Sequence, residues 1–315
     1  MFRVKALALL SVLALAGCSY EAPGPAVEEP VGLAVDAPRV TVEEPGSGER
    51  RVLEFTDVGN EQNLTYTVTE GFNQELLEAQ AAETFQASDI DTATTTLPLD
   101  AEVDEASEPA EGQQPATRNV FATVGNPQFD GDGNVDSAEG FQFGWRAVDS
   151  GQMSSLRLAA PRDASDEARG IAEQSVMKLT ALPIVFPEEE IGEGGRWTVE
   201  SRVTGESTML QTTTYTVTAL NDDTVTLSVD IDQRPSLGAL SFDGQAEGTD
   251  LEGKELEVLD SSTESEGEIT IDLTQPLPVA GDVTFNTKVT YGTTDSDLRV
   301  VQSSSTEMEF SEAQE

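Results

Sequence analysis

The segment from Asp130 to Glu139 has residue types and spacing that suit a calcium ion. Oxygen-bearing side chains recur along it at Asp130, Asp132, Asn134, Asp136 and Glu139. Such oxygens can converge on one hard cation. Two positions depart from the EF-hand loop, because Val135 stands where the turn needs glycine and Phe141 where it needs a bidentate glutamate. We therefore expect an acidic turn between strands, with calcium binding as the weaker alternative, and we predict no other metal and no cofactor.

The chain lacks the side chains on which most hydrolases and zinc enzymes depend. It has no histidine and a single cysteine in 315 residues. Catalytic triads and histidine-containing zinc sites are thereby excluded. A carboxylate pair for glycoside hydrolysis remains chemically possible. With 59 acidic residues, however, some pair reaches the required spacing by chance. We expect a protein that is not an enzyme.

The single cysteine, Cys18, ends an apolar N-terminal run. Arg3 and Lys5 precede 12 uncharged residues, which is too short a run for a bilayer that needs about 20. The sequence Leu15-Ala-Gly-Cys18 resembles the lipobox of bacterial lipoprotein signal peptides. The resemblance implies removal of residues 1–17, acylation of Cys18 (palmitate among the chains), and an extracytoplasmic protein anchored to the cell membrane by this lipid.

The composition is strongly acidic. Removing residues 1–17, which contain two basic residues, would change the net charge from −42 to −44. Nucleic acid is excluded as a partner, because its binding depends on lysine and arginine at the phosphates. A chain of this charge favours cationic partners, divalent ions or neutral apolar ligands.

Two segments have compositions typical of disorder. Residues 18–50 are rich in proline and glutamate, and we expect a disordered tether between the membrane and the folded part. The alternative is an ordered arm that lies on the domain, in which Val40-Thr-Val42 pairs as a short strand. Residues 88–117 are acidic with few large apolar side chains, which predicts a flexible insertion. Residues 73–87 have helical spacing. The remainder, 51–315, is predicted to be a single β-rich domain.

Alternation of apolar and polar residues dominates the sequence after residue 119. Apolar residues recur at every second position in the runs 141–147, 225–231 and 269–273. With the same period, two further segments each place four apolar residues on one face: Val283, Phe285, Val289 and Tyr291, and Leu298, Val300, Met308 and Phe310. This period is typical of antiparallel strands with one buried face. We predict a mainly β (α+β) fold with one large, curved antiparallel sheet and one or two helices packed on one of its faces.

One amphipathic helix is predicted over residues 165–180. Ser165 can cap it, and Pro183 follows its end. Its apolar stripe consists of Ala168, Ile171, Ala172, Ser175, Val176 and Leu179. Most of these side chains are small and would fill little volume against a curved sheet. They are our candidate lining for a ligand pocket.

The segment from Leu182 to Trp197 is the most distinctive block of the chain. Its glycines permit a sharp turn, and Trp197 opens a strand, where we expect it to anchor the core rather than bind a ligand. The block, with the strand around Tyr215 and the segment 267–281, resembles a family of uncharacterised lipoproteins of high-GC Gram-positive bacteria. The likeness covers about residues 119–312 and implies a surface lipoprotein without implying a function.

The predicted architecture is loosely similar to that of the mycobacterial lipid-carrier lipoproteins and the LolA-type carriers. This likeness implies a non-catalytic module that carries an apolar molecule of the cell envelope. The alternative is a structural surface lipoprotein that binds another envelope protein and takes no small molecule. An apolar cavity of about 300–1,000 Å³ between helix and sheet would favour the carrier.

Overall fold

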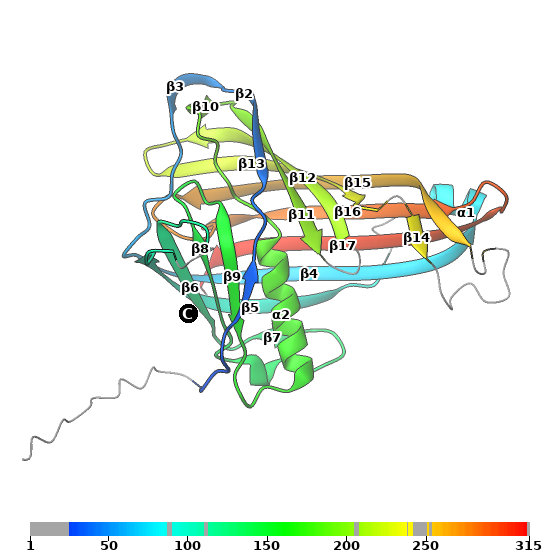
Figure 1. Cartoon of the computed structure of the whole chain (residues 1–315), viewed down its shortest axis with the longest axis horizontal. Coiled ribbons are helices and arrows are strands. Elements are labelled where there is room, and N and C mark those ends of the chain that lie inside the picture. The colour runs from blue at the N-terminus through cyan, green and yellow to red at the C-terminus, as the bar shows by residue number, and fades with distance from the viewer. Residues whose placement is uncertain are drawn as a thin grey trace, which may run out of the picture.

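The structure is a computed structural model that describes residues 25–86, 90–109, 113–204, 208–237, 239–241, 251 and 254–313. The predicted signal peptide and Cys18 lie outside these residues. The described chain is mostly β and forms one large antiparallel sheet of 15 strands, with two α-helices (Figure 1). This confirms the predicted fold class.

The sheet consists of two meanders joined side by side. In each meander, strands that follow one another in the chain are neighbours in the sheet. The first contains β4 (Glu61–Glu78), β5 (Ala93–Glu105), β6 (Arg118–Val124), β8 (Gln142–Ala147) and β9 (Met153–Ala159). The second contains β11 (Arg196–Thr204), β12 (Thr208–Leu220), β13 (Thr224–Pro235), β15 (Glu255–Asp272), β16 (Ala280–Gly292) and β17 (Leu298–Glu312). The meanders meet where β4 pairs with β17. Two short strands, β7 (Gln128–Phe129) and β14 (Ala239–Ser241), pair with β5 and β15.

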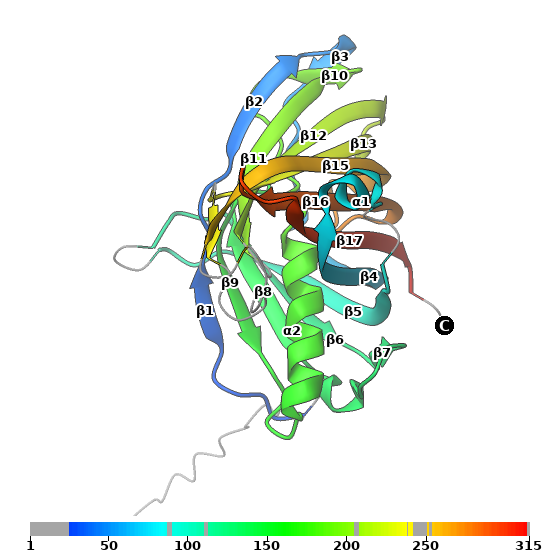
Figure 2. The same ribbon diagram turned by 90° about the vertical axis from the view of Figure 1, so that its right-hand side faces the viewer.

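The helix α2 (Asp166–Thr180) connects the two meanders and lies inside the curve of the sheet (Figure 2). Ser165 is its N-cap, with its Oγ accepting a hydrogen bond from the backbone N–H of Ala168 at 3.1 Å. Asp166 and Glu167 occupy the first turn and Lys178 the last, which suits the helix dipole. The short 3-10 helix η1 (Asp136–Ala138) packs beside α2.

The prediction of a disordered tether over residues 18–50 was wrong for the described part of this segment. Residues 31–51 form three strands, β1 (Val31–Ala34), β2 (Arg39–Glu44) and β3 (Ser47–Arg51). β1 pairs with β9 at one edge of the sheet, and β2 pairs with β11 at the other edge. β3 pairs separately with β10 (Ile191–Glu193). We call residues 27–51 the strap, because they cross from one sheet edge to the other.

Two further predictions for the N-terminal half were wrong. Residues 73–87 do not form one helix: β4 continues to Glu78, and the helix α1 (Ala79–Thr84) follows. The predicted flexible insertion at 88–117 contains β5, which pairs with both β4 and β6. Its inward residues, among them Leu97 and Leu99, are buried, while the acidic residues that dominate its composition point outward.

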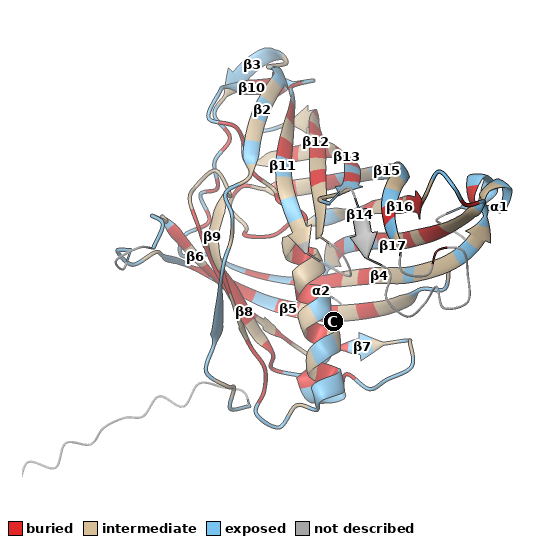
Figure 3. Ribbon diagram, turned by 45° about the vertical axis from the view of Figure 1, so that its right-hand side comes forward, coloured by how far each residue is buried: buried red, intermediate tan, exposed pale blue. Residues whose placement is uncertain are grey.

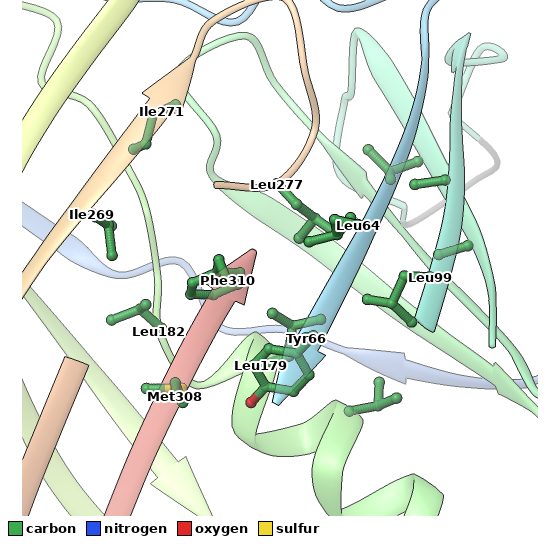
Figure 4. Close-up of a cluster of buried hydrophobic side chains, with 14 of the residues drawn as sticks. Leu64, Tyr66, Leu99, Leu179, Leu182, Ile269, Ile271, Leu277, Met308 and Phe310 are labelled. Carbon is green, nitrogen blue, oxygen red and sulfur yellow. The ribbon is translucent and has the colours of Figure 1, made fainter. Parts of the chain in front are cut away.

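The main core lies between the concave face of the sheet and one face of α2. Side chains from β4, β15, β17 and α2 meet there, including Tyr66, Leu179, Ile269 and Phe310 (Figure 4). The long strands then project past the helix (Figure 3). Burial decreases along β4 and β15, but β16 and β17 are buried again toward their far ends in a second, smaller core of Leu251, Leu256, Val289, Tyr291 and Val300. No helix in the described ranges is both long and apolar enough to cross a bilayer.

Candidate functional site

The helix α2 turns two different faces toward the sheet. Ala168, Ala172 and Val176 are fully buried in the main core. The adjacent face, with Ile171, Gln174, Ser175, Met177 and Lys178, faces a cavity above the sheet floor. One helix therefore closes the core on one side and forms the wall of an open space on the other.

This cavity has a volume of about 530 Å³. Opposite α2, its lining comes from β4, β5, β7, β11, β12, β13, β16 and β17, so both meanders contribute. The large apolar residues of the lining are Phe72, Phe129, Ile171, Met177, Val203, Met209, Phe285 and Val289. Phe72 is 44% exposed, an unusual fraction for a large aromatic residue at the wall of a cavity. The volume falls within the range of small-molecule sites, about 300–1,000 Å³.

The charged groups in the cavity lining form one pair. Lys178 Nζ lies 3.5 Å from Glu70 Oε2, and it donates to the hydroxyl of Thr306 at 3.4 Å. Gln174 donates from its side-chain amide to the other carboxylate oxygen of Glu70. The site thus carries no net charge, in contrast to the strongly acidic molecule as a whole.

A chain of buried hydrogen bonds crosses the floor of the cavity. The amide of Gln211 donates to the carbonyl of Ala181 at 2.9 Å, directly after the end of α2. Gln233 donates to Gln211 Oε1 at 2.7 Å and accepts from the hydroxyl of Thr287 at 3.1 Å. Because these side chains are buried, their mutual bonds offset the cost of removing them from water. The chain holds the helix end, β12, β13 and β16 in fixed relative positions.

The six residues predicted to line a pocket divide between the two faces of α2. Ile171 and Ser175 line the cavity. Ala168, Ala172 and Val176 pack in the core instead, and Leu179 borders a separate void of about 50 Å³. The prediction for these last four was wrong in detail, because the small residues sit where helix and sheet are in direct contact. The cavity lies one face further round the helix.

The segment 130–139 forms a turn that docks against the start of α2. Asp130 Oδ1 accepts from the backbone N–H of Thr94 at 2.6 Å, while Asn134 donates to Asp136 at 3.0 Å. Glu167 of α2 accepts from the Asn134 backbone at 3.2 Å. The described residues contain no cluster of three acidic, cysteine or histidine side chains that could hold a metal, so Asp132 and Glu139 complete no calcium site there.

Trp197 is a core residue, as expected. It is fully buried between Phe186 and Tyr215, and its indole N–H donates to the carbonyl of Val185 at 2.9 Å. The segment 182–187 is thereby fixed against β11.

A buried ion pair between Arg118 and Asp57 was not predicted. Their side chains are almost completely inaccessible, and the guanidinium lies 4.1 Å from the centre of the Phe55 ring. Burial raises the pKa of Asp57, with the attraction of Arg118 opposing the shift. The pair lies apart from the cavity lining. Charged residues are rarely buried, so a sequence gives little reason to predict such a pair. The only available signal was the apolar residues that neighbour each partner in the chain.

No protein-family model matches the chain, and no curated protein matches it. The cavity and the N-terminal sequence are the features of the chain that bear on its function.

Proposed function

We propose that this protein is a lipid-anchored, extracytoplasmic carrier that binds an apolar or amphiphilic molecule of the cell envelope beneath α2. The observation that supports it most is the 530 Å³ cavity between the helix and the concave sheet. A helix with a purely structural role would be expected to lie on a filled core along both of its inward faces. Here only one of those faces does so.

The chemistry of the chain also supports a binding role. Histidine is absent, and the N-terminal sequence resembles a lipoprotein signal, which would put a protein of this kind beside lipid molecules. The cavity lining mixes aromatic and aliphatic side chains with hydroxyl and amide groups, a composition common in ligand sites.

Binding of an uncharged fluorescent fatty-acyl ester to the mature chain, residues 18–315, tests the proposal. We expect saturable binding at one site per molecule. The variant Ser304→Phe should abolish it, because Ser304 lines the cavity and a phenyl ring there would fill the space.

Ser262→Phe is the matched control. Ser262 is an exposed residue on the outward face of β15, so it allows the same serine-to-phenylalanine change away from the cavity. This variant should bind the probe as the wild type does. Absence of saturable binding to the wild-type protein would contradict the carrier proposal. The interaction role, in which the acidic outer surface meets another envelope protein, would then be favoured.

A further inference from the structure

The inward-facing residues of the central strands change character along the strands. Beside the helix they are apolar and buried, as in the aligned row Val68, Met308 and Val283. At the far end they are apolar again, in the row Leu76, Val300 and Tyr291. Between these rows, the cavity lining includes five hydroxyl or amide side chains at inward positions of β13, β16 and β17. We call them the polar belt: Gln233, Thr287, Gln302, Ser304 and Thr306.

Contacts within the protein explain only part of the polar belt: Gln233 and Thr287 belong to the buried hydrogen-bond chain, and Thr306 accepts a bond from Lys178. Apolar residues occupy the inward positions of the same strands on both sides of it, so valine or isoleucine would suit the backbone equally well. Burying a hydroxyl or amide costs free energy unless it is hydrogen-bonded. A wall whose only purpose is packing gains nothing from five such groups.

The belt retains hydrogen-bonding capacity for a ligand. A hydroxyl has one donor and two acceptor lone pairs, and an amide has two donors and a carbonyl oxygen. Thr287 gives its proton to Gln233 Oε1 and lies 3.1 Å from the hydroxyl of Thr263, which leaves its oxygen one lone pair for a further bond. Gln302 uses one amide proton on Gln74 at 2.8 Å and has a second.

The charge of the cavity restricts the ligand further. Glu70 and Lys178 neutralise each other at 3.5 Å, so neither an anionic nor a cationic head group finds an uncompensated opposite charge in the described lining. A charged head group would also lose its hydration on entry, which is costly without a partner.

We infer that the ligand is an uncharged amphiphile whose hydroxyl, ester or amide groups lie on the polar belt, an inference that rests on the proposed function. Its apolar chain would contact Phe72, Phe285 and Val289, which alternate with the belt residues on the same floor. A plain hydrocarbon leaves the belt unpaired, and a fatty acid brings a charge that the cavity does not compensate.

Competition against the fluorescent ester tests this ligand class. The competitors are monopalmitoylglycerol, palmitate and hexadecyltrimethylammonium, which share a chain length and differ in head group, each below its micelle-forming concentration. We expect monopalmitoylglycerol to displace the probe at a concentration about tenfold lower than the two charged compounds, the effect of one to two hydrogen bonds.

Two belt variants connect the preference to these side chains. Thr287→Val and Ser304→Ala each remove one hydroxyl and should weaken monopalmitoylglycerol about fivefold, the effect of one hydrogen bond, while the charged compounds change little. Thr226→Val is the control, because the Thr226 hydroxyl pairs with Thr270 at 3.4 Å on the opposite face of the sheet.

The outcomes separate the two proposals. If the probe never binds saturably, the proposed carrier function fails and this inference with it. If the probe binds and all three competitors displace it equally, the carrier function stands and the uncharged ligand class is overturned. An undiminished preference for monopalmitoylglycerol in both belt variants would also overturn it.

Discussion

Tyr66 and Tyr215 place two phenol groups in the core, one in each meander. Burial raises the pKa of both. The Tyr215 hydroxyl donates to the carbonyl of Pro183 at 3.1 Å, whereas the Tyr66 hydroxyl has no hydrogen-bond partner among the described residues. In the unfolded chain both phenols ionise near pH 10. Above that pH the unfolded state therefore binds fewer protons, and the free energy of unfolding must fall as pH rises.

Tyr66→Phe should reduce this alkaline loss of stability. Each buried tyrosine contributes a slope of up to about 1.4 kcal/mol per pH unit above pH 10. Urea unfolding between pH 9 and pH 11 would show a shallower decline for the variant, and near-equal stability at pH 8, since only an unpaired hydroxyl is removed. Parallel curves for variant and wild type would contradict the burial of Tyr66.

Removing one partner of the Arg118–Asp57 pair should lower the free energy of unfolding strongly, whereas replacing both partners by apolar residues should lower it little. Arg118→Met leaves the Asp57 carboxylate buried without its partner, and we expect a loss of about 3–5 kcal/mol in the free energy of unfolding. The double variant Asp57→Leu with Arg118→Met should recover most of that loss, because burial opposes the charged forms of both groups. Denaturant unfolding of the two single variants and the double variant measures the coupling. A double variant as unstable as Arg118→Met would show that the charges themselves stabilise the fold.

At the scale of the element, substitutions in α2 test which of its faces packs in the core. Ala172 is fully buried against the sheet, so Ala172→Phe should overpack the core and destabilise the domain by at least about 1–3 kcal/mol. Gly170 in the same helix faces open space, so Gly170→Ala should raise stability by up to about 1 kcal/mol. Thermal unfolding followed by circular dichroism compares the two. An Ala172→Phe variant that keeps its stability and loses probe binding would instead place Ala172 in the cavity.

Elements with one clearly apolar face were predictable, and those without one were not. The runs around Leu227, Ile271 and Phe285 are strands because alternation fits a sheet with a single core. The strand β5 also alternates, but its outward aspartates and glutamates gave it a composition typical of disorder. Strand pairing overrides helical spacing at Leu76, which lies opposite Val300 of β17. Pairing between residues so distant in the chain leaves no local signal.

The candidate site was predictable only in outline. The helix and its position inside a curved sheet followed from the amphipathic pattern. The cavity did not, because Thr287 and Ser304 interrupt the apolar alternation of their strands and were not recognised as inward-facing. A polar residue at an inward position is the sequence signal for such a site, and it becomes clear only when strand registers are known.

For the whole molecule, the prediction that matters most concerns its attachment. Cys18→Ser should move the protein from the membrane fraction to the medium, or leave it as an unprocessed precursor. Each buried acyl methylene contributes about 0.8 kcal/mol, so two or more chains would anchor the protein stably. Fractionation in detergent-free buffer, followed by mass spectrometry of the N-terminus, measures the effect. A serine variant that still sediments with membranes would contradict the lipobox assignment.

The strap fixes the N-terminal end of the described chain to the folded domain. Glu28 pairs with Arg169 of α2 at 2.5 Å, and Arg196 of β11 pairs with Glu43 at 2.7 Å. The strap thus contacts the helix and both edges of the sheet. If Cys18 carries the lipid, residues 19–26 lie between it and the strap, so the folded domain would be held within about 30 Å of the bilayer.

The junction of β4 with β17 also determines when the molecule is able to fold. Within each meander, neighbouring strands are close in the chain and can pair early. The pairing of β4 with β17, in which Leu64 lies opposite Glu312, can form only after almost the whole chain has been made. Contacts so distant in sequence slow folding. Until β17 is complete, β4 presents an unpaired edge on which other chains can add strands. A chain that ends at residue 297 should therefore aggregate on refolding, which light scattering would record, even though it retains the first meander and most of the second.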